Sequence, residues 1–207
     1  MSRRPRLTEQ VHARLAAHLR GGDRAVDATA GNGHDTLFLA RQVGGQGQVW
    51  AFDVQSQALM ATRKRLQQAG LADRVNLVHA GHQALSRHLP ATTLGQVKAV
   101  VFNLGYLPGG DHALITRPET TLAALNSAWE ALAPAGVISL MIYRGHPGGA
   151  AEFDAVADWC RSRGIEPEAP DGPARSPKAP IWWLLTRCGT RDVQPDAGGA
   201  PAASSAG

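Results

Sequence analysis

Short apolar runs of β-forming residues alternate with amphipathic helical patterns along most of this chain of 207 residues. Strands that are separated by helices pair in parallel, because the helix carries the chain back to the same edge of the sheet. The pattern predicts an α/β fold of the Rossmann-like type, a mostly parallel sheet with helices on both faces. Strands are expected at 24–28, 48–54, 74–79, 97–103, 136–143, 164–168 (a weak one) and 180–188. Helices are expected at 8–19, 34–43, 56–68, 83–88, 116–133 and 150–163.

Two helix starts carry capping signals. Thr8 precedes the first helical pattern and is expected to cap it. Thr116 and Glu119 have the spacing of a capping box, which predicts that a helix begins there.

Chain length and composition predict one domain over residues 1–188. Apolar residues make up 43% of the sequence and charged residues 18%, which is ordinary for a globular protein. Residues 189–207 are dominated by Gly, Ala, Pro and Ser, so we expect a disordered tail there.

The sequence favours a cytoplasmic protein. No apolar run reaches the roughly 18 to 20 residues that a membrane helix needs. Cys160 and Cys188 are not in a CxxC arrangement, so we expect two reduced, buried thiols and no metal site. The net charge of +4 is compatible with a phosphate-rich partner but does not by itself indicate one, and nothing points to DNA or a membrane.

A glycine turn between the first strand and its helix predicts a nucleotide-type cofactor. Gly31 and Gly33 flank Asn32 and let a ligand approach the backbone closely. Asp53 ends the second strand about 20 residues later, where a carboxylate accepts hydrogen bonds from ribose hydroxyls. Dinucleotide binding needs a third glycine where this chain has Thr36, so we favour S-adenosylmethionine over NAD.

Other candidate cofactor contacts end the first three strands. Asp27 is expected either to accept a hydrogen bond from the ammonium group of the cofactor or to be a buried carboxylate that binds backbone donors of the turn. His82 and Gln83 follow the third strand, where an adenine edge would lie, and His82 has the alternative of capping the next helix. Gln55 is a weaker candidate for contact with adenosine.

The loops after the fourth and fifth strands are expected to hold the substrate, because ligands of open α/β sheets lie beyond the carboxyl ends of the strands. Asn103 to Tyr106 resembles the Asn/Asp-Pro-Pro-Tyr motif of methyltransferases that act on amines, with Leu-Gly in place of Pro-Pro. Tyr106 is expected either to contact the substrate or to pack under the loop.

An amine with a pKa near 10 has to lose a proton before it can accept a methyl group. The candidate bases are Asp111, His112 and His146, and a solvated turn is the alternative for the first two. Arg144 precedes His146 in a glycine-rich loop and can supply positive charge to a phosphate, although a purely structural turn is also compatible.

Four segments together resemble one family. They are DATAGNGHDTLFLA, AFDVQSQAL, FNLGYLPGGDH and YRGHPGG, in this order between residues 23 and 152. They are similar to the bacterial and plant family once called putative rRNA methylases, which is now associated with 5-aminomethyl-2-thiouridine at the tRNA wobble position.

The resemblance implies a class I methyltransferase with a seven-stranded sheet and an antiparallel last hairpin. It implies conversion of a 5-aminomethyl group to 5-methylaminomethyl with S-adenosylmethionine, and the anticodon region of tRNA as partner. With the residues above, the expected cofactor set is Asp27, Gly31, Asn32, Gly33, Asp35, Thr36, Asp53, Gln55, His82 and Gln83. The expected reacting set is Asn103, Tyr106, Asp111 and His146.

One loop departs from the family pattern. Residues 174–180 lack the Asn and Gln expected there, and Arg175 and Lys178 can bind phosphate instead. This departure bears on the identity of the substrate. Three other functions also stay open: methylation of ribosomal RNA or another amine, an NAD-dependent oxidoreductase, and a non-catalytic cofactor-binding module. The oligomeric state is open between monomer and homodimer.

Overall fold

A computed structural model describes residues 6–107, 109, 114–169, 176 and 179–188. The strands are β1 (Arg24–Asp27), β2 (Gln48–Asp53), β3 (Val75–His79), β4 (Val97–Leu104), β5 (Leu132–Ile142) and β6 (Ile181–Thr186). The helices are α1 (Leu7–His18), α2 (His34–Gln42), α3 (Ser56–Gln68), α4 (Leu85–His88), α5 (Pro118–Ala131) and α6 (Gly149–Ser162). None of these helices is long and apolar enough to cross a membrane.

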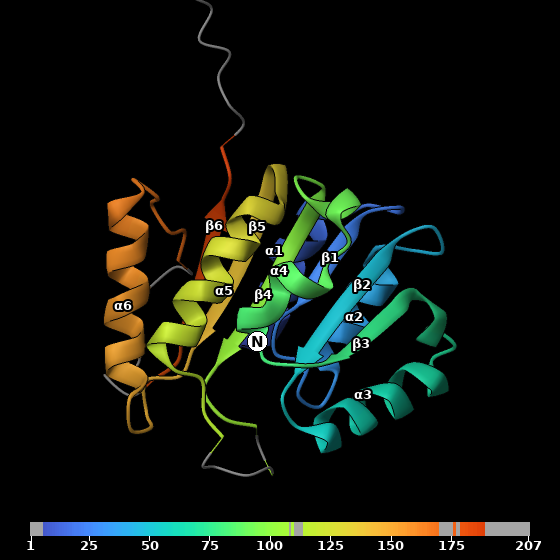
Figure 1. The fold of residues 1–207 in the computed structure, drawn as a ribbon, viewed down its shortest axis with the longest axis horizontal. Helices are drawn as coiled ribbons and strands as arrows, with labels where there is room; N and C mark the ends of the chain where they lie inside the picture. Colours follow the sequence, from blue (N-terminus) through green and yellow to red (C-terminus); the bar gives the residue numbers. More distant parts are fainter. Residues whose placement is uncertain (1–5, 108, 110–113, 170–175, 177–178, 189–207) are drawn as a thin grey trace, which may run out of the picture.

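The strands form one sheet in the order β3-β2-β1-β4-β5-β6, as Figure 1 shows. The first five strands are parallel, and β6 returns antiparallel to β5. The expected α/β class with a mostly parallel sheet is therefore confirmed.

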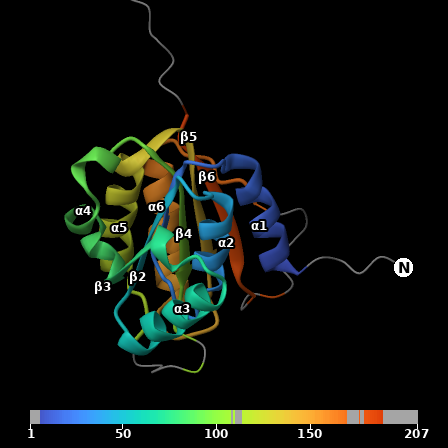
Figure 2. The same ribbon diagram turned by 90° about the vertical axis from the view of Figure 1, so that its right-hand side faces the viewer.

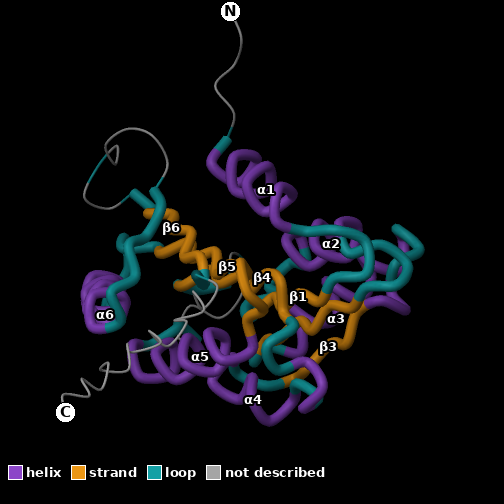
Figure 3. Tube along the Cα trace, turned by 90° about the horizontal axis from the view of Figure 1, so that it is seen from above, coloured by secondary structure: helices purple, strands orange, loops and turns teal. Residues whose placement is uncertain are grey.

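Helices cover both faces of the sheet (Figures 2 and 3). On one face α1, α2 and α3 pack on strand residues such as Ala99 and Val101. On the other face α4, α5 and α6 pack on the alternate residues Val100 and Phe102. This alternation follows from the two-residue period of a strand, and it buries the central strands on both sides.

The carboxyl ends of the parallel strands meet at one edge of the sheet. Asp27 ends β1 and Asp53 ends β2, while Asn103 lies at the end of β4 opposite Met141 of β5. The register therefore gathers polar residues from distant parts of the sequence at a single edge.

The sheet has six strands in the described part of the chain, so the expected count of seven was wrong. The segment expected as a weak strand, 164–168, makes only an isolated antiparallel bridge from Glu168 to Leu184. Glu168 and Leu184 exchange both backbone hydrogen bonds, at 2.9 and 2.8 Å, and this pair is not part of a named strand.

Both predicted helix caps were wrong. The N-cap of α1 is Arg6, whose backbone N–H donates to the Glu9 carboxylate at 2.7 Å. The N-cap of α5 is Arg117, which is followed by a proline that is well suited to the first helical position. Thr116 instead donates its hydroxyl to Glu152 at 2.7 Å, so a tertiary contact replaces the local cap.

Cys160 is buried as expected, but Cys188 is exposed because β6 ends two residues earlier, at Thr186. Both thiols are free. The tail expected to be disordered, 189–207, lies outside the described residues.

Candidate functional site

The glycine turn after β1 is held tightly by α3. Gly31 and Gly33 both have positive φ, 52° and 76°, and Gly33 is the N-cap of α2. A Cβ on Gly33 would lie 2.7 Å from Oγ1 of Thr62, so glycine is required by contact as well as by conformation. Thr62 also donates its hydroxyl to the Gly31 carbonyl at 3.1 Å, and Arg65 donates to the Asn32 carbonyl at 2.8 Å.

Asp53 lies directly beside this turn. One carboxylate oxygen accepts the Gly31 N–H and the other accepts the Gln55 N–H, both at 2.9 Å. Each carboxylate oxygen has a second lone pair, so Asp53 can still accept a ligand hydroxyl. The turn, the end of β2 and the start of α3 thus form one rigid unit.

Asp27 is fully buried and bound by the protein itself. Thr36 donates its hydroxyl to one oxygen at 2.6 Å, and the Thr29 N–H donates to the other at 3.2 Å. Burial raises the pKa of Asp27 to about 7, and the negative charge of Asp35 adds to this effect. These are the contacts of a carboxylate that fixes the turn, one of the two roles considered for this residue.

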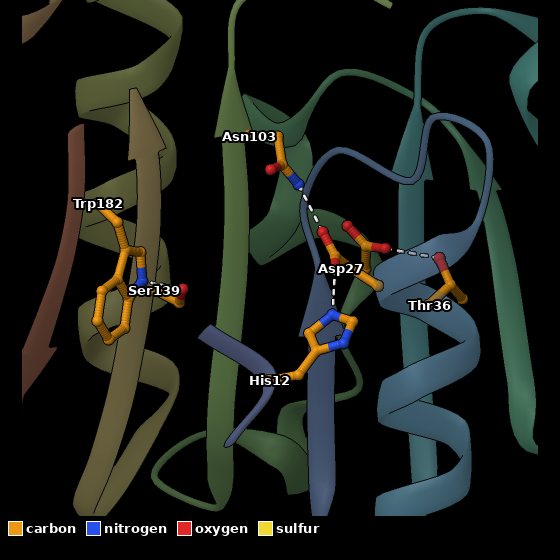
Figure 4. A network of polar contacts seen from close by, with 7 residues as sticks. His12, Asp27, Thr36, Asn103, Ser139 and Trp182 are labelled. Atoms are coloured by element: carbon orange, nitrogen blue, oxygen red, sulfur yellow. Dashed lines mark hydrogen bonds and ion pairs between the residues drawn. The ribbon is translucent and has the colours of Figure 1, made fainter. Parts of the chain in front are cut away.

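Asp35 links α1 to β4 through contacts with His12 and Asn103, two residues that Figure 4 labels. His12 Nε2 lies 2.6 Å from one oxygen of Asp35, and Asn103 donates its side-chain N–H to the other at 2.8 Å. Burial favours a higher pKa for Asp35, but the hydrogen bonds from His12 and Asn103, together with the charges of nearby imidazoles, lower the pKa overall. Asp35 is therefore an ionised acceptor at neutral pH.

His82 is a buried imidazole in the 3-10 turn His82–Ala84 that follows β3. Its ring meets Phe102 edge-on at 5.9 Å, and its Nε2 has no hydrogen-bond partner among the described residues. Burial lowers the pKa of His82 to about 4, so the ring is neutral near pH 7. A buried nitrogen without a partner suits contact with a ligand. The neighbouring Gln83 is exposed.

Tyr106 and His146 lie next to each other beyond β4 and β5. Their rings meet edge-on at 6.1 Å, and Tyr106 is 43% exposed. His146 Nδ1 lies 2.9 Å from the Pro147 carbonyl, which can only accept, so Nδ1 carries the proton. The buried Nε2 is therefore the ring nitrogen that can accept a proton, and it lacks a partner in the described part of the chain. Asp111 and His112, the other candidate bases, lie outside the described residues.

Arg144 bridges the two loops at this end of the sheet. It lies over the Phe153 ring at 5.4 Å and makes long contacts to the carbonyls of Ser176, at 3.5 Å, and Ala179, at 3.4 Å. Arg175 and Lys178 of the unusual loop are outside the described residues. Tyr143 is 44% exposed nearby, and its pKa is raised by burial and by the charge of Asp35.

Several residues of this edge were missed by sequence reasoning. His12 reaches Asp35 from α1, and Thr62 and Arg65 reach the glycine turn from α3, but no local motif marks them. Thr29 accepts the backbone N–H of Asn103 at 2.7 Å, and its place inside the glycine-turn motif was the one available signal. No metal-binding cluster of three or more His, Cys, Asp or Glu side chains occurs among the described residues.

The sheet order, the glycine turn and the acidic residue ending β2 define a class I methyltransferase fold. Residues 49–166, more than half of the chain, match the family described as "Putative rRNA methylase". The chain belongs to this family.

Known relatives agree with this assignment. The chain is 40% identical over 161 residues to the chloroplastic tRNA (mnm(5)s(2)U34)-methyltransferase of Arabidopsis thaliana, a match covering 74% of this chain and 58% of that protein. It thus spans little more than half the length of this relative.

Two crystal structures are similar over nearly their whole lengths. The "putative rRNA-methylase" from Clostridium thermocellum is 38% identical to this chain, with a TM-score of 0.81. The match covers 89% of this chain and 99% of that one. The "putative methyltransferase" from Streptococcus mutans, in complex with SAH, is 33% identical with a TM-score of 0.75. The match covers 90% of this chain and 99% of that one.

Proposed function

We propose that this chain is a cytoplasmic S-adenosylmethionine-dependent N-methyltransferase with a single domain over residues 1–188. Its proposed substrate is 5-aminomethyl-(2-thio)uridine at the wobble position of tRNA, and its product is the 5-methylaminomethyl nucleoside. The name of the Arabidopsis relative supports the substrate, and the SAH bound to the Streptococcus mutans relative supports the cofactor. The observation that carries the proposal is the orientation of the Asn103 amide. Its nitrogen donates a hydrogen bond to Asp35, and its oxygen takes no part in that bond.

The residues at the strand ends fit S-adenosylmethionine. Asp53 offers acceptors for ribose hydroxyls, and His82 has a buried nitrogen without a partner where an adenine edge would lie. Asp35 makes this edge acidic because its lowered pKa keeps it ionised at neutral pH, and this charge favours the positive sulfonium and ammonium groups. When bound, the cofactor supplies a methyl group on a positively charged sulfur.

The other half of the site binds and activates the amine. Asn103 Oδ1 accepts an N–H of the neutral amine, which leaves the nitrogen lone pair for attack. The substrate ammonium group first loses one proton, and its neutral nitrogen then forms the new bond to carbon as the carbon–sulfur bond breaks, which leaves the product as a secondary ammonium group. His146 takes that proton on Nε2, because Nδ1 is committed to the Pro147 carbonyl.

The proposal is tested with the purified full chain, labelled S-adenosylmethionine and two tRNA samples that differ only in the 5-aminomethyl group. Mass spectrometry of the nucleosides should show a gain of one methyl group on 5-aminomethyluridine and none in the unmodified tRNA. Methyl transfer to ribosomal RNA or to a protein amine, and not to tRNA, would contradict the proposed substrate. Failure to bind the cofactor, or tight binding of NAD, would refute the methyltransferase assignment.

Asp53→Ala provides the matched variant. Loss of a charge-assisted acceptor of about 1.5–3 kcal/mol should weaken cofactor binding by tenfold or more. Asp73→Ala is the control, because Asp73 is an exposed carboxylate in the 3-10 turn Ala72–Arg74 before β3. Equal binding by both variants would contradict the role of Asp53.

A further inference from the structure

His12 connects the N-terminal helix to the reacting end of the site. It lies on α1, outside every motif of the sheet edge, and its Nε2 is 2.6 Å from Asp35. Its ring also stacks on Phe38 of α2, with ring centroids 4.0 Å apart and planes at 5°. The His12 side chain is 25% exposed and that of Asp35 18%, so the pair is largely shielded from water.

Asp35 transmits this contact to Asn103. Its second oxygen accepts the Asn103 side-chain N–H at 2.8 Å. An ionised carboxylate has no proton to donate, so Asn103 has to turn its NH₂ group toward Asp35. In Figure 4 the hydrogen bond of Asn103 starts at its amide nitrogen, and its amide oxygen points away from that bond.

We propose that His12 is a positioning residue for methyl transfer, which fixes Asp35 so that Asn103 presents Oδ1 to an N–H of the acceptor amine. This inference rests on the proposed function. An asparagine amide has nearly the same shape when flipped, so packing alone does not select its orientation. A flipped Asn103 amide would turn its own N–H groups toward the N–H of the substrate amine. The hydrogen bond from the amine to Oδ1 would then be lost. The His12–Asp35–Asn103 chain selects the productive orientation by hydrogen bonding.

The alternative is that His12 only tethers α1 through its stack on Phe38. Two substitutions separate these roles. His12→Phe keeps an aromatic ring over Phe38 and removes the donor, whereas His12→Gln keeps an N–H donor and removes the ring. A positioning role predicts that the glutamine variant is the more active one, and a tether predicts the opposite.

The experiment measures kcat and KM for aminomethyl-bearing tRNA, and Kd for S-adenosylhomocysteine, with the wild-type full chain and both variants. His12→Phe should lower kcat by about tenfold or more, because misplacing a reacting group by a small distance costs up to about a hundredfold. His12→Gln should stay within about threefold of the wild type, as expected when one hydrogen bond is kept. The Kd for S-adenosylhomocysteine should be unchanged in both variants.

A double-mutant cycle with Asn103→Ala tests the route through Asn103. If His12 acts through that amide, His12→Phe should have no further effect in the Asn103→Ala background. Additive losses, or equal kcat values for His12→Phe and His12→Gln, would overturn the inference and leave the proposed function intact. A wild-type protein that transfers no methyl group to aminomethyl-bearing tRNA would overturn the proposed function itself.

Phe38→Leu gives a second test that does not depend on the folding of His12→Phe. It removes the ring stack and leaves the His12–Asp35 contact in place. Wild-type kcat in this variant supports the hydrogen-bonded chain as the functional element. A loss as large as that expected for His12→Phe would assign the effect to the stack and overturn the inference.

Discussion

The two halves of the sheet edge are built differently. At the ends of β1 and β2, Asp27 and Asp53 each accept two hydrogen bonds from the protein. Beyond β4 and β5, Tyr106 is partly exposed, and Arg144 Nε and His146 Nε2 are buried without a partner in the described part of the chain. The turn and the ends of β1 and β2 are fixed before any ligand binds, whereas the second half, like His82 after β3, retains buried polar groups that a ligand can satisfy.

The same contrast appears at two helix starts. Gly33 caps α2 in the first half and Gly148 caps α6 in the second, both in the left-handed region with φ of 76° and 86°. A Cβ on Gly33 would lie 2.8 Å from Cα of Thr62, but a Cβ on Gly148 would meet nothing within 4 Å. Similar backbone conformations thus carry different packing constraints.

Replacing these two glycines should give the largest difference between the halves. Gly33→Ala adds a clash with the Thr62 backbone, at about 1–3 kcal/mol, to the roughly 1–2 kcal/mol that the left-handed conformation costs a non-glycine residue, for a total of about 2–5 kcal/mol. Gly148→Ala should cost only about 1–2 kcal/mol, because it lacks the clash. Urea unfolding monitored by circular dichroism measures both losses, and equal values would contradict the contrast.

Within the second half, the His146 imidazole should matter for rate and not for cofactor binding. His146→Gln removes the basic Nε2, and we expect kcat to fall by about a hundredfold or more, the usual range for loss of a general base. The Kd for S-adenosylhomocysteine should stay unchanged. His88→Gln, at an exposed position on α4, is the control.

The pH dependence of that loss sharpens the test. An aliphatic amine has a pKa near 10, so raising the pH from about 7 to 9 increases its neutral fraction and reduces the need for a base. The deficit of His146→Gln should therefore shrink as the pH rises. A deficit that stays constant, or a fall in cofactor affinity, would assign His146 to a structural role.

The fixed half was also the more predictable one. The strand and turn around Gly31 and Gly33, with the carboxylate of Asp53, could be placed from local patterns, because apolar runs and turn residues determine where parallel strands end. His12 could not be placed in this way. Its contact with Asp35 spans 23 positions and depends on how α1 packs over α2, which helical periodicity does not specify.

Local rules failed where distant partners competed for the same group. Thr116 has the spacing of a capping residue, yet Glu152, which is 36 positions away and buried, takes its hydroxyl. Glu152 also accepts the hydroxyl of Thr121 at 2.6 Å, so a buried carboxylate recruits two threonines and the helix start moves to Pro118. Leaving the buried carboxylate of Glu152 without hydrogen-bond donors would cost more free energy than losing the helix cap. The contact of Thr116 with Glu152 is therefore favoured over capping.

The smallest expected effect concerns Asp27 and separates its burial from its hydrogen bonds. Its pKa is raised by burial from 3.8 to about 7, so between these values the folded chain holds a proton that the unfolded chain has released. The free energy of unfolding should therefore fall as the pH rises from about 4 to 7, by about 1–3 kcal/mol relative to an Asp27→Asn variant. Chemical unfolding of both proteins across this range measures the difference. A constant difference would mean that Asp27 is already ionised, and that its bonds to Thr36 and Thr29 outweigh the cost of burial.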